Sequence, residues 1–261
     1  TNWIMKKIYS YISLVALAAI SAGCAEELVN PEEQLTNSNK QEQVINGELT
    51  VQLSVPASAQ TKTVLGAKDG STYPVYWSPE DVITLNGTAA TEFTPSDDNT
   101  SATAKFKLTS LTAPYNFLYG GVSGKGDQVS YPATQNYVAD GFDPAAMPMY
   151  ASVTDLKGNV AFSHVGSLLR FSFTGTNKIS SITLTAADNS KSLSGNFTIG
   201  TTDGVLDGSL TPVSGNASLL YSFGEDKQLS QTPFVFYVAV PSGTYPGGIS
   251  LEVYDNDSGH M

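Results

Sequence analysis

Cysteine and histidine are nearly missing from this sequence. Its 261 residues include one cysteine, Cys24, and two histidines, His164 and His260. A single thiol cannot form a disulfide within the chain, and the residue spacings of structural zinc sites do not occur. We therefore predict no disulfide framework and no metal site.

Charged residues are scarce, and positive charge is the scarcer sign. Asp, Glu, Lys and Arg make up 14% of the chain, and the net charge is −11. The sole arginine is Arg170. Nucleic-acid backbones are bound by concentrated basic patches, and none is visible here, so nucleic acid is excluded as a partner. Hydrophobic residues still reach 41%, which is enough to form sizeable cores.

The residues that commonly carry catalysis form no constellation. A Ser-His-Asp triad built on His164 has no partners that the sequence can place. The runs Asp97-Asp98 and Asp255-Asn256-Asp257 lack the alternating ligand positions and the closing Glu of a calcium loop, and are better interpreted as turns. We predict that the chain is not an enzyme, has no catalytic residue and uses no cofactor.

The N-terminal segment has the pattern of an export signal. Lys6 and Lys7 precede the apolar run Ile8–Ile20, which is too short for a spanning helix. Small residues then lead to Cys24, an arrangement that resembles the lipobox of bacterial lipoproteins, with Ser21 where that motif usually carries Leu. We expect Cys24 to be acylated and to become the first mature residue. The alternative is an ordinary secretory signal with an incidental cysteine.

The segment after the signal is predicted to be a tether. Translation is expected to start at Met5, which leaves residues 1–4 upstream of a signal peptide that ends at residue 23. Residues 24–43 are rich in Asn, Gln and Glu and cannot bury enough surface to fold. The acidic pair at 26–27 resembles the surface-export signal of lipoproteins in Bacteroides-type bacteria, and the alternative is a solvated linker.

The rest of the chain reads as short β-strands. In residues 44–55, Leu49, Val51, Leu53 and Val55 alternate with polar residues, which indicates a strand with one buried face. Similar segments recur, punctuated by Gly, Pro and Asp, at 73–87, 104–108, 115–119, 179–185, 193–199, 219–223, 234–240 and 249–254. No segment keeps helical spacing over three turns, so the predicted fold class is all-β.

The stretch 159–175 divides the chain into two β-rich halves. Leu169, Phe171 and Phe173 alternate with polar residues and predict a core strand, with 179–185 as its partner across a turn. A length of 261 residues suggests two domains at roughly 100 to 150 residues each. We predict two antiparallel β-sandwiches, an N-terminal one at 44–157 and a C-terminal one at 158–261.

Several segments together resemble the fimbrillin-like surface lipoproteins of Bacteroides-type bacteria. The resemblance spans most of the chain from about residue 45, and it rests on the motifs at 61–63, 75–83, 162–171, 236–248 and 251–255. It implies two transthyretin-like β-sandwiches exported as a lipoprotein that builds or anchors surface fimbriae. In polymerising members a protease removes the N-terminal strand, and a donor strand from the next subunit fills the vacated groove.

Carried onto this chain, the resemblance implies an exchangeable strand and a cut site. Leu49, Val51, Leu53 and Val55 would be the pocket-filling residues of the removable strand, and the loop 56–63 would be cut. The enzymes that process the family are often arginine-specific, whereas Arg170 lies inside a predicted strand, so Lys62 is the candidate cut site. The family also continues with further C-terminal strands, often the donor, so we expect this copy to be truncated.

The expected function is therefore that of a structural or adhesive lipoprotein at the outer membrane and cell surface. Its expected partners are other fimbrial subunits, the outer membrane through the lipid anchor, and a host or bacterial surface ligand. The alternative is a glycan-binding lipoprotein of a polysaccharide uptake system. Its sugar platform would draw on aromatic residues that usually belong to the core, namely Tyr73, Tyr76, Trp77, Tyr115, Tyr119, Tyr131 and Tyr137.

Overall fold

The computed structural model describes residues 44–54, 64–65 and 75–255, and the fold is all-β, as the sequence predicts. Antiparallel sheets dominate, and the only helical element in these ranges is the 3-10 turn Pro144–Ala146. The described residues belong to one compact unit that extends from Glu42 to Met261. The division into domains at 44–157 and 158–261 stays a prediction.

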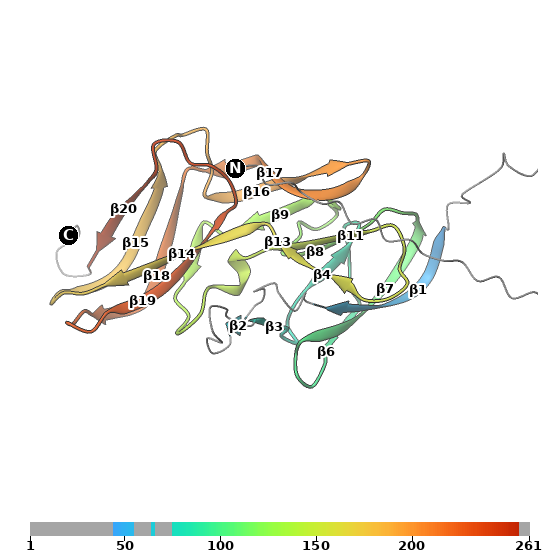
Figure 1. Cartoon of the computed structure of the whole chain (residues 1–261), viewed down its shortest axis with the longest axis horizontal. Helices are drawn as coiled ribbons and strands as arrows, with labels where there is room; N and C mark the ends of the chain where they lie inside the picture. Colours follow the sequence, from blue (N-terminus) through green and yellow to red (C-terminus); the bar gives the residue numbers. More distant parts are fainter. Residues whose placement is uncertain (1–43, 55–63, 66–74, 256–261) are drawn as a thin grey trace, which may run out of the picture. The chain divides into compact units, whose positions relative to one another are not determined.

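Two sheets enclose the first core (Figure 1). One has the order β12-β1-β7-β6, from Val160–Ala161, Ile45–Ser54, Ser101–Leu111 and Glu92–Pro95. The other has the order β13-β11-β8-β4-β5, from Ser163–His164, Met149–Val153, Tyr115–Tyr119, Ile83–Leu85 and Thr88–Ala89. The turn between β4 and β5 is formed by Asn86 and Gly87, both with positive φ, which is the conformation that an Asn-Gly pair favours in a tight hairpin.

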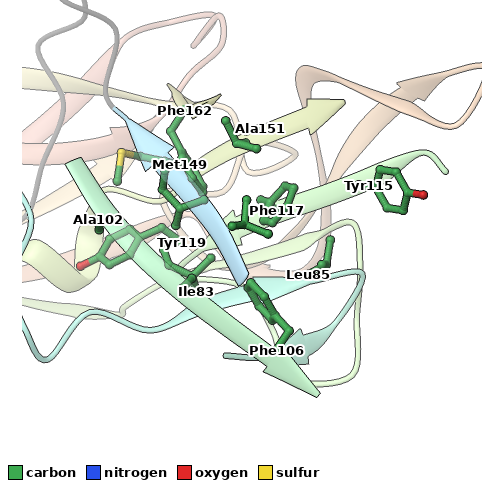
Figure 2. Packing of buried hydrophobic residues seen from close by; sticks show 14 of the residues in the cluster. Ile83, Leu85, Ala102, Phe106, Tyr115, Phe117, Tyr119, Met149, Ala151 and Phe162 are labelled. Atoms are coloured by element: carbon green, nitrogen blue, oxygen red, sulfur yellow. The ribbon is translucent and has the colours of Figure 1, made fainter. Parts of the chain in front are cut away.

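Alternating side chains from both sheets fill this core (Figure 2). Phe106 from β7 and Phe117 from β8 meet edge to face at 6.1 Å between ring centroids. Phe162 packs against Trp77 with centroids 5.5 Å apart. All four rings are almost fully buried. The inward residues of each strand therefore form a closed sandwich interior.

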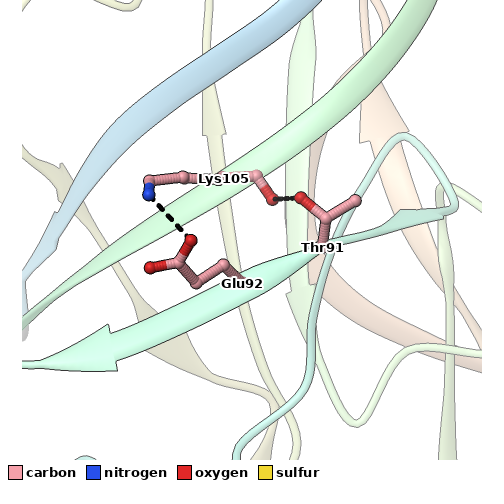
Figure 3. Close-up of polar contacts among 3 residues, drawn as sticks. All are labelled: Thr91, Glu92 and Lys105. Carbon is pink, nitrogen blue, oxygen red and sulfur yellow. Dashed lines mark hydrogen bonds and ion pairs between the residues drawn. The ribbon is translucent and has the colours of Figure 1, made fainter.

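The outer strand β6 of the first sheet is held to β7 by polar contacts at its surface. The Lys105 ammonium lies 2.7 Å from the Glu92 carboxylate, and the Thr91 hydroxyl donates to the Lys105 carbonyl at 3.1 Å (Figure 3). The ion pair is about half exposed, so it contributes no more than about 1 kcal/mol to stability. The burial of apolar side chains therefore matters far more to this sheet than its surface charges.

The second core lies between sheets of unequal width. One sheet has the order β10-β18-β15-β20, from Thr134–Asn136, Ser218–Gln228, Lys178–Ala186 and Ile249–Tyr254. The other contains, among the described residues, the two strands β14 (Gly166–Phe173) and β19 (Phe234–Pro241). Phe236 of β19 is central, because its ring stacks on Phe171 at 5.4 Å and on Tyr221 at 5.4 Å. Aromatic contacts thus join the two sheets.

Two smaller sheets complete the described structure. The order β17-β16-β9 combines Val205–Asn216, Ser194–Thr202 and Gln128–Tyr131, and the pair β2-β3 combines Val64–Leu65 and Val75–Tyr76. Strands β9 and β10 precede residue 157 in the chain, yet they join sheets whose other strands follow it. Within the ranges that the structure describes, no helix has the length and apolarity that a membrane span requires.

Two expectations about the stretch 159–175 are wrong. The predicted pair of 169–173 with 179–185 does not form, since β14 pairs with β19 whereas β15 pairs with β18 and β20. The predicted core strand β14 is an edge strand whose Leu169, Phe171 and Phe173 are only partly buried. Alternation identifies the inward face of a strand, but it does not reveal how many neighbours cover that face.

Candidate strand-exchange site

The predicted exchangeable strand, β1, lies in the interior of its sheet. It pairs antiparallel with β7 along nearly its whole length, from Ile45 opposite Leu111 to Ser54 opposite Ser101. On its other side it pairs in parallel with β12, where Leu53 lies opposite Val160. The seat of β1 is therefore the gap between β7 and β12, with backbone partners on both sides.

The large apolar side chains of β1 lie beside small side chains of β7. Val51 lies opposite Ala104, and Leu53 lies opposite Ala102. Both alanines are buried, and Val51 and Leu53 are 3% and 0% exposed. Small side chains beside larger ones let the two strands fill the core without voids. The small residues of β7 therefore leave room for the larger side chains of Val51 and Leu53, which are two residues apart on β1.

The opposite face of β1 is polar and exposed. Gln52 donates through its amide nitrogen to the Thr103 hydroxyl at 3.0 Å, and Glu48 lies opposite Lys107. At its beginning the strand is fixed by Asn46, whose side-chain oxygen accepts from the Ser110 amide at 2.6 Å. These contacts are at the surface and contribute little, so the inward side chains provide most of the binding energy of the strand.

The structure describes some of the predicted site residues and not others. Leu49, Val51 and Leu53 all lie on β1, where Leu49 is partly buried opposite Phe106. Cys24, the candidate cut site Lys62 and the last predicted pocket-filling residue Val55 lie outside the described residues. The assignments of these last three therefore stay predictions.

Most of the aromatic residues considered for a sugar platform belong to cores. Trp77, Tyr115, Tyr119 and Tyr131 are all buried. Burial raises the pKa of the Tyr119 and Tyr131 hydroxyls far above the ordinary range, and the nearby Asp81 carboxylate adds to the effect on Tyr119. Of the other three, Tyr76 and Tyr137 are partly buried and Tyr73 lies outside the described residues, so the sugar platform stays a prediction.

His164, considered for a catalytic triad, and Arg170, considered as a processing site, lie on different strands. His164 is in β13, opposite Met149 in β11. Arg170 is exposed on β14. Over the part of the chain that the structure describes, no group of three or more His, Cys, Asp or Glu residues could hold a metal ion.

Asp98 makes a turn between β6 and β7, as predicted for the acidic run at 97–98. Its carboxylate accepts from the Ser96 hydroxyl at 2.7 Å and from the Thr100 amide at 3.0 Å. These hydrogen bonds to the ionised form lower the pKa of Asp98 to about 2. The carboxylate is thus engaged as an acceptor within the turn.

The titration of Asp98 gives a direct test of this turn. Because its pKa is lower in the folded chain than in the unfolded chain, the turn is stabilised above the unfolded pKa, about 3.9. That stabilisation is lost as the pH falls through about 2. We expect the NMR shift of the Thr100 amide proton to titrate with a midpoint near 2, and a midpoint near 4 would contradict the turn.

Sequence reasoning missed one polar residue of the second core, Gln135 on β10. Its side chain is fully buried, donating to the Ala239 carbonyl at 2.6 Å and accepting from the Ala239 amide at 3.0 Å. The side chain thus imitates a neighbouring strand along the outer edge of β19. Nothing in the local sequence Thr134-Gln135-Asn136 indicates this, because the partner is 104 residues away.

Comparisons of the chain with protein-family models, with curated proteins and with solved structures found no match.

Proposed function

We propose that this chain is a structural and adhesive cell-surface lipoprotein, a subunit or anchor of a fimbria assembled by donor-strand β-augmentation. One observation carries the proposal. The first strand of the sandwich, β1, fills a seat between β7 and β12 with alternating apolar side chains. A strand held by backbone hydrogen bonds and by the fit of its apolar side chains can be replaced by another strand of the same pattern.

The energetics of exchange follow from this seat. Removal of β1 leaves unpaired backbone groups on β7 and β12, and it exposes the core face around Ala102, Ala104 and Phe162. Open edges and exposed apolar surface are both unfavourable in water. A donor strand from a neighbouring subunit relieves both costs at once. The unfilled site that destabilises a single subunit is therefore the site at which the donor strand of the next subunit binds.

The N-terminal sequence is consistent with this role. A lipid on Cys24 would hold the precursor at the outer membrane, and the tether at 24–43 would separate the sandwich from the lipid surface. Cleavage in the loop 56–63 would release β1 together with the anchor. The proposed partners are other subunits of the fimbria, and a host or bacterial surface ligand for adhesion.

The mature N-terminus in the native envelope tests the proposal. We expect mass spectrometry to find an acylated Cys24 on the precursor, and a new terminus between Pro56 and Val64 on assembled material. Assembled chains should migrate as a ladder that resists mild denaturation, because the donor strand is buried in the core. Lys62→Gln is the matched control, since it should block the cut and leave a monomer that retains β1.

A different behaviour of the shortened chain would contradict the fimbrial proposal. A chain that stays monomeric after removal of residues 25–62, and that binds polysaccharide in this form, would overturn the fimbrial proposal. Such a chain would instead act as a glycan-binding surface lipoprotein.

A further inference from the structure

Two chain connections meet at one end of the second sandwich. One joins β15 to β16 through residues 187–193, and the other joins β19 to β20 through residues 242–248. The Ala187 amide donates to the Gly248 carbonyl at 3.0 Å, so the two connections are hydrogen-bonded to each other. Both connections are internal to the described chain, and the last residue of β20 lies toward the opposite end of β15.

A cavity of about 100 Å³ lies between these connections and the β16-β17 hairpin. The hairpin contributes apolar side chains, among them Phe197 and Leu210. The connections contribute polar side chains, namely Ser190, Lys191, Ser192, Ser242, Thr244 and Tyr245. One water molecule needs roughly 10–15 Å³ of such space, so the cavity can hold several waters or one group of a few heavy atoms.

Lys191 is the one charged residue among those that line the cavity. It is half-buried, and it forms no ion pair with any residue that the structure describes. Lysine is rarely withdrawn from water without a partner of opposite charge. The net charge of the chain is −11, so carboxylates are far more numerous than the cations they could pair with. A lysine beside a cavity and without a carboxylate partner therefore indicates that an anion binds there.

The Asp188 carboxylate belongs to the same connection as Lys191 and holds its turn. It accepts from the Ser190 amide at 2.9 Å, and the Asp188 carbonyl accepts from the Lys191 amide at 2.9 Å. Hydrogen bonds from Ser190, with a smaller contribution from the charge of Lys191, lower the pKa of Asp188. The ionised carboxylate thus fixes the turn that carries Lys191, and its charge opposes the binding of an anion.

Hydroxyl groups surround the cavity and are available to a ligand. The hydroxyls of Ser192, Ser242 and Thr244 have no hydrogen-bond partner among the described residues. Each can donate to an oxygen of an anion, and the lysine ammonium supplies a compact positive charge. The connection that carries two of these hydroxyls is itself held in place, because the Tyr245 hydroxyl donates to the Pro241 carbonyl at 2.7 Å. A site with fixed walls loses little entropy when it binds.

We infer that this cavity binds one oxyanion group of a larger ligand, a sulfate, phosphate or carboxylate, with Lys191 as the cation and the three hydroxyls as donors. The cavity admits the anionic group, and the remainder of the ligand lies outside it. Acidic glycans carry such groups, so the site gives the proposed adhesion a class of ligand. Only this link to adhesion rests on the proposed function, because the anion site itself does not involve β1.

The first experiment titrates the full chain with sodium sulfate, sodium phosphate and sodium glucuronate, at an ionic strength held constant with sodium chloride. We expect saturable NMR shifts of the Lys191, Ser192 and Ser242 amides with at least one of the three anions. The anion that binds most tightly identifies the group that the ligand carries. Shifts no larger than those produced by chloride would overturn the inference.

Variants test the assignment to Lys191. Lys191→Gln removes the charge and should weaken binding of that anion about ten-fold, whereas the matched control Lys178→Gln, at an exposed residue of β15, should leave it unchanged. Asp188→Asn keeps the acceptor of the turn but removes the opposing charge, so it should tighten binding about three-fold. Equal binding by the two lysine variants, or unchanged or weaker binding by Asp188→Asn, would overturn the inference.

The titration uses the uncut chain, which retains β1. A failure to bind anions would therefore leave the fimbrial proposal intact, and a missing cut or a missing ladder of subunits would leave the anion site intact. The last measurement adds a sulfated chondroitin disaccharide, which carries both a sulfate and a carboxylate, to the chain loaded with the inorganic anion. Displacement of the anion from the same amides supports an acidic glycan as ligand, and binding of inorganic ions alone would overturn the inference of a larger ligand.

Discussion

Replacement of Leu53 by aspartate is expected to unfold the sandwich that surrounds β1. Leu53 is fully buried opposite Ala102 and Val160, with both neighbouring strands packed against it. A carboxylate there has no polar partner and loses its hydration, and this class of substitution costs about 4 kcal/mol or more. Small domains are typically stable by about 5–15 kcal/mol, so most of the stability should be lost.

The measurement is thermal unfolding of Leu53→Asp beside Gln52→Asp. Gln52 is the adjacent residue on the exposed face of β1, so the control places the same charge on the same strand and should change the melting temperature by only a few degrees. Equal melting temperatures for the two variants would contradict the assignment of β1 to the core, and with it the proposed seat.

Replacement of Gln135 by leucine is expected to destabilise the second sandwich. Leucine keeps most of the side-chain volume but removes both hydrogen bonds to Ala239, whose buried amide and carbonyl then have no partner. Each buried polar group left unsatisfied costs about 1–3 kcal/mol, so we expect a total loss of about 2–6 kcal/mol. The edge of β19 should also become open.

Urea unfolding and amide exchange measure the two effects of Gln135→Leu separately. The midpoint of unfolding should fall, and the Ala239 amide should lose its protection from exchange. The control is Gln231→Leu, which makes the same substitution at an exposed residue and should change neither. Retention of slow exchange at Ala239 in the Gln135 variant would show that the edge is closed by other means.

The local pattern predicts strands well where alternation is strong. The segment expected at 44–55 is β1 at Ile45–Ser54, and the segment expected at 115–119 is β8 at Tyr115–Tyr119. It fails where strands are polar or short. The segment Val205–Asn216 is not among the segments expected to be strands, yet it forms β17, because β16 supplies its hydrogen bonds. The hydrogen bonds to β16, rather than an alternation of side chains in the segment, therefore account for this strand.

The candidate strand-exchange site also combines a feature that the sequence predicts with one that it does not. The inward face of β1 is readable from Leu49, Val51 and Leu53, because a period of two places alternate residues on one side of any strand. The recesses at Ala102 and Ala104 are not readable, because they depend on the register between strands some 50 residues apart in sequence. The site that holds β1 is therefore determined by how the strands pair and in which register.

The sequence by itself determined the all-β fold and the inward side of the strongest strands, since both follow from the alternation of neighbouring side chains. The tertiary structure alone decided which strands are neighbours. It placed β1 between two partners, whereas β14 has one partner among the described strands. The pairing also brought Gln135 to the edge of β19, and it brought Lys191 and Thr244 to one cavity. Strand pairing joins residues distant in sequence, so no local pattern encodes where a sheet ends.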